Sequence, residues 1–187
     1  MSNKSFTLQA GDKTVELPVL SGSTGADCID IGKLYKETGS FTYDPGFMST
    51  ASCRSAITYI DGDAGILQYR GYPIEQLAKH SNFTEVSYLL MNGELPDAGQ
   101  LAKFEHEVTH HTMMHEAFRT FLYGFRHDAH PMAMLTGMLG SLAAFYHSDL
   151  NLDDPEERRL AAIRLLAKVP TIAAACYRYS IGWPIRY

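Results

Sequence analysis

The chain has 187 residues, about the size of one domain, since most domains run from ~100 to ~200 residues. Hydrophobic residues make up 45% of it and charged residues 20%, a composition that excludes an intrinsically disordered polypeptide. The formal net charge of −5 argues against a nucleic-acid-binding protein, and no apolar run approaches the ~20 residues of a membrane helix.

The start of the chain has the pattern of a β-hairpin. Apolar and polar residues alternate over residues 5–10 and 13–19, on either side of Gly11-Asp12. The next stretch, residues 20–46, is rich in glycine and favours irregular structure with short strands.

A second hairpin is predicted over residues 57–70. Two short runs rich in β-branched and aromatic residues flank the turn-forming cluster 61–65, so the loop should have four or five residues. Pro73 then suits the first turn of a helix. We therefore expect a β-rich segment at 1–70 and helices from 71 to 187.

Helix-start signals recur after residue 80. Asn82 with Glu85, and Asp97 with Gln100, have the spacing of capping boxes, in which two side chains satisfy the first unpaired N–H groups of a helix. Gly93 is placed to end the first of these helices.

The most apolar helix is predicted over residues 132–145, with Pro131 in its first turn. Apolar residues lie on almost every side of it, and Gly137, Gly140 and Ala143 are spaced three apart. A helix that is apolar on every side is buried on every side. We expect it at a subunit interface, and the alternative is the central helix of a single core.

Further helices are expected on either side of this one. A short helix should lie near residues 117–125. Asp154-Pro155 is a strong helix start, because a capping side chain precedes a proline. Pro170 is expected to end that helix and to restart the chain as a separate helix over 172–180, which Gly182 terminates.

Histidines invite a metal hypothesis, because His111 and His115 are four residues apart and such spacing on one helical face suits a zinc ion. We favour structural or surface roles, since no carboxylate–cysteine set accompanies the histidines as further ligands. For His130, helix capping is favoured over substrate contact. The histidines of the cluster are His106, His110, His111 and His115.

Arg164 and Lys168 are also four residues apart, so their charges share a helical face. One interpretation is a pair of solvated cations, with Lys168 complementing the C-terminus of its helix. The other is an anion-binding site. Spacing alone favours the first.

The cysteines indicate a reducing compartment. Cys28, Cys53 and Cys176 are an odd number with no close pair, which fits neither a disulfide framework nor a metal motif. The first residues also lack the apolar core of a signal peptide. We therefore expect a cytoplasmic protein.

Five sequence blocks carry a resemblance to a known family. They occur in the same order as in citrate synthases, and the chain resembles the N-terminal portion of that family, in particular the hexameric, NADH-regulated type of Gram-negative bacteria. The blocks are DCIDI at 27–31, YDPGF at 43–47, ITYIDGDAGILQYRGYPIEQLA at 57–78, YLLMNGELP at 88–96 and DAHPM at 128–132.

The resemblance implies a mainly α-helical fold, in which citrate synthase-like large-domain helices follow a β-rich N-terminal segment with hairpins. It implies an enzyme that condenses acetyl-CoA with oxaloacetate to citrate and CoA, without a metal or other cofactor, in a homo-oligomer that is a dimer or a hexamer. It implies no nucleic-acid or membrane partner. The alternatives are a portion of 2-methylcitrate synthase, which takes propionyl-CoA, and a non-catalytic helical oligomerisation or regulatory module.

The resemblance also locates the expected catalytic residues. The family uses two histidines and an aspartate, with the histidines in segments similar to HADHEQNAST and GPAHGGAN, and neither segment occurs before Tyr187. We therefore expect no catalytic residue in this chain, and we expect the chain alone to be inactive.

The resemblance also implies an allosteric NADH-binding site. The family pattern is an Arg-His-Thr-Met run, a tyrosine, and an arginine and a lysine on a later helix. The first position here is a histidine, which titrates near neutral pH, whereas arginine keeps its charge. The matching residues are His110, His111, Thr112, Met113, Tyr146, Arg164 and Lys168.

Overall fold

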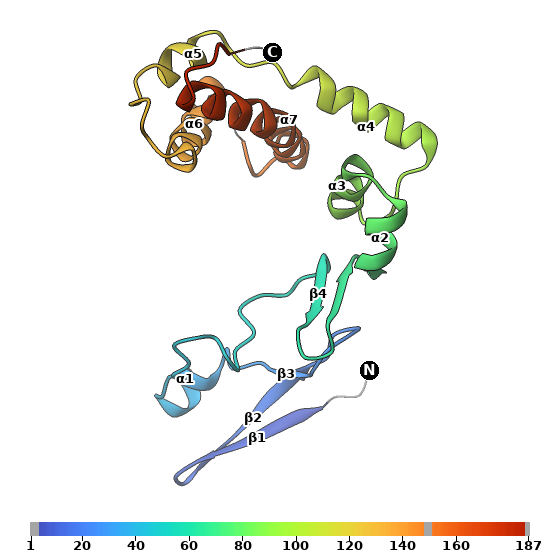
Figure 1. Ribbon diagram of the computed structural model, residues 1–187. Helices are drawn as coiled ribbons and strands as arrows, with labels where there is room; N and C mark the ends of the chain where they lie inside the picture. The colour runs from blue at the N-terminus through green and yellow to red at the C-terminus, as the bar shows by residue number, and fades with distance from the viewer. Residues whose placement is uncertain (1–3, 148–150, 186–187) are drawn as a thin grey trace. The chain divides into compact units, whose positions relative to one another are not determined.

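A computed structural model describes residues 4–147 and 151–185 of the chain. The chain divides into two compact units, residues 1–95 and 96–187 (Figure 1). The first contains the strands and three helices, and the second contains four helices, within the described ranges.

The first sheet of the N-terminal unit is antiparallel, with the order β1-β2-β3. Gly11, with φ +62°, lies in the turn between β1 and β2, where glycine adopts the left-handed conformation without steric cost. The predicted first hairpin is therefore confirmed. The strands are β1 (Ser5–Ala10), β2 (Lys13–Leu20) and β3 (Cys28–Ile29).

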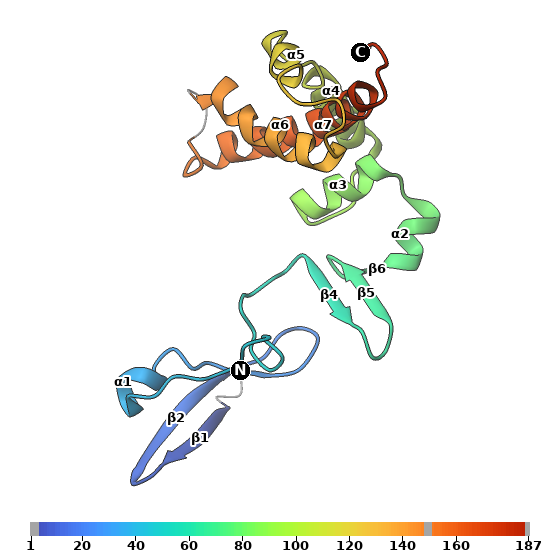
Figure 2. The ribbon, with the colours of Figure 1, turned by 60° about the vertical axis from the view of Figure 1, so that its left-hand side comes forward.

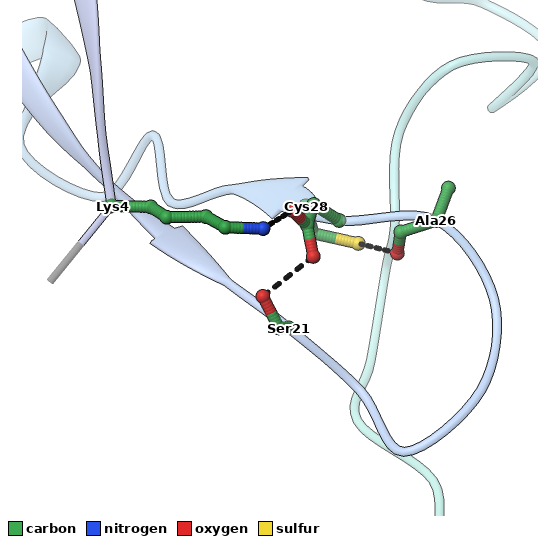
Figure 3. Close-up of polar contacts among 5 residues, drawn as sticks. Lys4, Ser21, Ala26 and Cys28 are labelled. Atoms are coloured by element: carbon green, nitrogen blue, oxygen red, sulfur yellow. Dashed lines mark hydrogen bonds and ion pairs between the residues drawn. The ribbon is translucent and has the colours of Figure 1, made fainter. Parts of the chain in front are cut away.

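Asp27 fastens the loop that leads into β3. Its carboxylate accepts hydrogen bonds from Nζ of Lys4 at 2.8 Å and from Oγ of Ser21 at 2.5 Å. These bonds lower the pKa of Asp27, because they favour the charged carboxylate. Figure 3 shows the Lys4 and Ser21 side chains that reach this point, and the Cys28 thiol beside the Ala26 carbonyl.

A short helix, α1 (Leu34–Thr38), packs against β2. Its buried side chain is Leu34, and the buried side chains of β2 are Val15 and Leu17. The sequence predicted only irregular structure and short strands here. The helix was missed because it has five residues and begins without a capping side chain, so it carries neither periodicity nor an N-terminal signal.

The second sheet has the antiparallel order β4-β5-β6. The hairpin loop has four residues, and the Asp61 side chain accepts a hydrogen bond from the Ala64 N–H at 2.9 Å. The predicted second hairpin is confirmed. The two small sheets support a β-rich segment only loosely, because long stretches between them have no regular structure. The strands are β4 (Thr58–Asp61), β5 (Ile66–Tyr69) and β6 (Tyr72–Pro73).

Arg70 connects this hairpin to the helices that follow. Its backbone adopts φ +52°, an uncommon conformation for a side chain of this size. Its guanidinium donates hydrogen bonds to the carbonyl of Ala56 at 3.3 Å and to that of Leu90, in α3, at 2.7 Å. Arg70 thus joins the start of the hairpin to the end of a helix. The helices are α2 (Ile74–His80) and α3 (Phe83–Asn92).

Both predicted capping boxes are present. At α3 the backbone N–H of Glu85 donates to the Asn82 side chain at 2.9 Å, and the Glu85 carboxylate accepts from the Asn82 N–H at 2.7 Å. Asp97 and Gln100 form the same pair of bonds at the start of α4 (Ala98–His110). Two helix starts are therefore set by side chains only three residues apart.

The core of the C-terminal unit lies between α6 and α7, which run side by side (Figure 2). α5 packs against the same cluster. The Tyr179 hydroxyl donates a hydrogen bond to the Phe125 carbonyl at 2.6 Å, which joins α7 to the chain just after α5. The helices are α5 (Ala117–Leu122), α6 (Pro131–Phe145) and α7 (Pro155–Ser180). The large buried side chains include Phe118, Leu122, Met134, Met138, Ile172 and Tyr179.

The prediction that Pro170 ends a helix is wrong, because Pro170 lies inside α7, a continuous helix of 26 residues. An internal proline costs about 3 kcal/mol, since it removes one backbone hydrogen bond and crowds the preceding turn. Here Pro170 is exposed, while Ile163 and Ile172 on either side of it are fully buried. Burying such side chains stabilises the helix by about 1.5–3 kcal/mol each, enough to offset the proline.

Among the described helices, α7 alone is long and apolar enough to cross a membrane by length and composition. Core helices of water-soluble proteins pass the same test. One side of α7 supplies Ile172, Ala175 and Cys176 to the core cluster. We therefore assign α7 to the core of the unit.

The prediction that α6 is buried on every side is not met within this chain. Its buried residues form one stripe, Met134, Met138 and Leu142, while Met132 keeps 59% of its surface exposed. The two glycines also differ. A Cβ at Gly137 would lie 2.9 Å from Cζ of Phe125, whereas one at Gly140 would have nothing within 4 Å. The stripe is set by i, i+4 spacing, and the side of α6 that carries Met132 and Gly140 is exposed among the described residues.

This difference predicts opposite effects of two matched substitutions. Gly137→Ala should destabilise the chain, because displacing Phe125 costs ~1–3 kcal/mol, more than the ~0.5–1 kcal/mol gained by replacing a helical glycine. Gly140→Ala should only gain that smaller amount. Urea unfolding of both variants measures the shifts. Shifts in the same direction would contradict the close contact at Gly137.

Candidate anion-binding site

Two cations meet one tyrosine ring in the C-terminal unit. Tyr146 is the residue at which α6 ends, and Arg164 and Lys168 lie one turn apart on α7. The guanidinium carbon of Arg164 lies 4.6 Å from the centre of the Tyr146 ring, and Nζ of Lys168 lies 5.6 Å from it. Both distances are within the ~6 Å range of cation–π attraction. The structure thus brings together three of the residues predicted from the sequence.

Lys168 is the buried charge of this group. Only 3% of its surface is exposed, and its ammonium donates hydrogen bonds to the carbonyl of His111, at 2.6 Å, and to that of Met113. These carbonyls follow the last residue of α4, where main-chain acceptors have no helical partner. The expectation of two solvated cations is therefore wrong for Lys168, because its charge is enclosed and bonded to main chain.

His111 faces the same charges. Burial lowers its pKa first, and the positive charges of Arg164 and then Lys168 lower it further, since all three disfavour the imidazolium. Glu107 acts in the opposite direction. His111 therefore carries little positive charge of its own near neutral pH, and any attraction for an anion must come from the neighbouring cations.

The other predicted residues have bonds within their own segment. Nδ1 of His110 donates to the His106 carbonyl at 2.7 Å, because a carbonyl can only accept, and the two imidazoles stack with centres 3.8 Å apart. Oγ1 of Thr112 donates to the Thr109 carbonyl at 2.8 Å. Met113 contributes its carbonyl to Lys168, while its side chain is 64% exposed. The Nε2 atom of His110 is the ring nitrogen that these bonds do not use.

A small hollow, with room for about one water molecule, adjoins Tyr146 and Lys168 and is lined otherwise by apolar and aromatic side chains. Ligand pockets usually measure ~300–1,000 Å³. This hollow is therefore too small for a ligand ring in the present arrangement, and a dinucleotide would lie on the surface beside it.

A zinc site is not formed by the clustered histidines. α4 ends at His110, so His111 and His115 do not share a helical face, and Nδ1 of His115 accepts a hydrogen bond from the Ala117 N–H at 3.1 Å. Residues 4–147 and 151–185 hold no group of three or more metal-ligating side chains. His130 caps α6, accepting at Nδ1 from the Met132 N–H at 3.2 Å, which confirms the capping interpretation.

Comparison with known proteins identifies the family. A sequence model described as "Citrate synthase, C-terminal domain" matches residues 46–187, most of the chain. The chain belongs to the citrate synthase family.

Solved structures agree with this assignment. The citrate synthase of Thermotoga maritima is 31% identical with a TM-score of 0.66, and the match covers 78% of this chain and 37% of that one. The citrate synthase of Pyrobaculum aerophilum is 26% identical with a TM-score of 0.68, covering 100% and 41%. That of Thermoplasma acidophilum, in a ternary complex with carboxymethyl coenzyme A and oxaloacetate, shares the fold at 23% identity and a TM-score of 0.68, covering 75% and 37%. The chain thus spans about two fifths of the length of the citrate synthases it matches.

The burial of Lys168 is the feature of this citrate synthase-family chain that sequence reasoning missed. A signal for it exists, because Lys168, Ile172 and Ala175 follow the i, i+4, i+7 spacing of one helical side. The last two are buried in the core. A lysine that continues a core stripe predicts a buried ammonium with main-chain acceptors, since an unpaired buried charge is very costly.

The lowered pKa of His111 predicts a loss of stability on acidification. The unfolded chain binds the proton more readily than the folded chain, so the free energy of unfolding falls as the pH drops below the ordinary value of 6.5. Urea unfolding about one pH unit above and below that value measures the effect. His111→Asn should reduce the difference between the two conditions, and the exposed His147→Asn serves as the control. An undiminished difference in His111→Asn would contradict the assignment.

Proposed function

We propose that the chain is the N-terminal portion of a citrate synthase that condenses acetyl-CoA with oxaloacetate to give citrate and CoA. The observation that carries the proposal is the family match over residues 46–187. The fold relative from Thermoplasma acidophilum was solved with a coenzyme A derivative and oxaloacetate bound, which supports these substrates. Residues 71–187 would then form the first part of the large domain.

The chemistry of this reaction needs a base that removes a methyl proton from acetyl-CoA. It also needs a donor that polarises the ketone of oxaloacetate, where the new carbon–carbon bond forms. Water then cleaves the thioester and releases CoA. By resemblance to the family, two histidines and an aspartate act as this base and this donor. We place them outside this chain, because the motifs that carry the histidines do not occur among its 187 residues.

Two other functions compete with this one. A 2-methylcitrate synthase would take propionyl-CoA, but its members generally lack the long N-terminal β extension that residues 1–50 resemble. A helical oligomerisation or regulatory module would have no catalytic part. The gene sequence beyond the Tyr187 codon decides between enzyme and module. Histidine segments of the family there would support the enzyme, and a different domain would exclude it.

The uncovered sides of α6 support assembly into a homo-oligomer, a dimer and in the Gram-negative type a hexamer. Met132 on α6 is 59% exposed, and Gly140 leaves room for another backbone. Apolar surface of this kind is more often covered by a second subunit than left in water. The same type of enzyme is cytoplasmic, which agrees with the scattered cysteines.

We propose the surface around Tyr146 and Arg164 as an NADH-binding regulatory site. Arg164 supplies a planar, permanently charged group that suits a phosphate, and Tyr146 supplies a ring next to the hollow. His110 adds less than the arginine that the resembled type has at this position, because its Nδ1 proton is bonded to the His106 carbonyl and a neutral imidazole has no second N–H to donate. The proposal makes this chain one of the NADH-regulated type.

The chain by itself should show no citrate-forming activity. Purified chain would be incubated with acetyl-CoA and oxaloacetate while thiol release is monitored, with the complete Thermotoga maritima enzyme as the positive control. The expected rate equals the background without protein. Turnover above background would place catalytic residues within this chain and contradict the proposal.

Arg164→Ala should weaken NADH binding to the chain by about tenfold to a hundredfold. A hydrogen bond to a charged group is worth roughly 1.5–3 kcal/mol, and each 1.4 kcal/mol is a factor of ten. His110→Arg should tighten binding, because it restores a permanent charge. Titration with NADH fluorescence measures both, and Arg158→Ala, an exposed cation on the same helix, is the matched control. Equal NADH affinity in wild type and Arg164→Ala would contradict the proposal that NADH binds this surface.

A further inference from the structure

Lys168 and Arg164 differ in what surrounds them, although both are cations on the same side of α7. Lys168 is 3% exposed, and Arg164 is partly exposed. The ammonium of Lys168 has three N–H donors and no acceptor. Two of these donors are bonded to the carbonyls of His111 and Met113, and the Tyr146 ring lies 5.6 Å away. The protein itself therefore uses most of the bonding capacity of Lys168.

The carbonyls that Lys168 binds lie just after the end of α4, where the main chain leaves the regular helix. α4 ends at His110, and residues 112–116 between α4 and α5 have no regular structure. The His111 N–H donates to the Val108 carbonyl at 3.1 Å and the Thr112 N–H to the Thr109 carbonyl at 3.4 Å, so the backbone bonds here reach back into α4. A lysine from α7 therefore completes the end of a helix that is more than fifty residues away in the sequence.

We propose that Lys168 is a positioning residue: it holds the segment from His111 to Met113 beside Arg164, and Arg164, not Lys168, makes the ionic contact with a bound phosphate. This inference rests on the proposed NADH site. It also departs from the family pattern, which would count the lysine among the residues that bind NADH directly. Its consequence is that the site offers one permanent cation to the ligand where the sequence suggests two.

Hydrogen exchange in the absence of any ligand tests the positioning role. Lys168→Met should speed exchange of the amides in residues 112–116 by about tenfold, because the segment loses both bonds. Lys168→Gln, which keeps an N–H donor but no charge, should recover part of the protection. The exposed Lys103→Met should leave these amides as in wild type. Unchanged exchange in Lys168→Met overturns the positioning role, whatever the chain binds.

The salt dependence of NADH binding tests which cation meets the phosphate. Ionic contacts weaken with added salt, so the slope of log Kd against log salt concentration reports them. Arg164→Met should flatten the slope, while Lys168→Met and Lys168→Gln should weaken binding and keep the wild-type slope. A slope that flattens equally in the Lys168 variants makes Lys168 a ligand and overturns the inference.

Failure of the NADH proposal looks different. If wild type binds no NADH at all, the proposed regulatory site is wrong, and so is the assignment of the phosphate contact to Arg164. The exchange measurement, made without ligand, still decides whether Lys168 holds the segment after α4.

Discussion

The buried ammonium of Lys168 is the interaction on which the arrangement of the C-terminal unit's site depends. It joins α7 to the two carbonyls that follow α4 and lies against the ring at the end of α6. An unpaired charge in this position would be strongly unfavourable, whereas hydrogen bonds to a charged group contribute roughly 1.5–3 kcal/mol each. The ends of α4 and α6 are thus held beside the middle of α7 by one residue, whose own burial requires these contacts.

The packing beneath this point explains why α7 can supply the lysine. α7 and α6 bury a shared stripe that includes Met134, Met138 and Ile172, and this burial keeps α7 continuous through Pro170. A break at the proline would free the second half of the helix to turn relative to Arg164 and Lys168. The core therefore fixes the direction in which both cations face Tyr146.

Local features of this fold could be predicted from the sequence and non-local ones could not. The hairpin at 57–70 and the capping box of Asn82 and Glu85 depend on residues within a few positions of each other, and both were found. The continuity of α7 depends on tertiary packing that outweighs the local effect of Pro170, and it was missed. The same distinction applies to the site. The i, i+4 spacing of Arg164 and Lys168 predicts a shared side, but only the fold reveals that one of them is enclosed by main chain from residue 111.

The NADH-regulated type that the chain resembles has an arginine and a lysine at the positions of Arg164 and Lys168, and we propose different roles for these two residues. A crystal structure of the chain with NADH would test that separation most directly. The account predicts Nζ of Lys168 on the His111 and Met113 carbonyls with and without ligand, and a phosphate oxygen on the guanidinium of Arg164. A Lys168 side chain that leaves those carbonyls to bind the phosphate would contradict it.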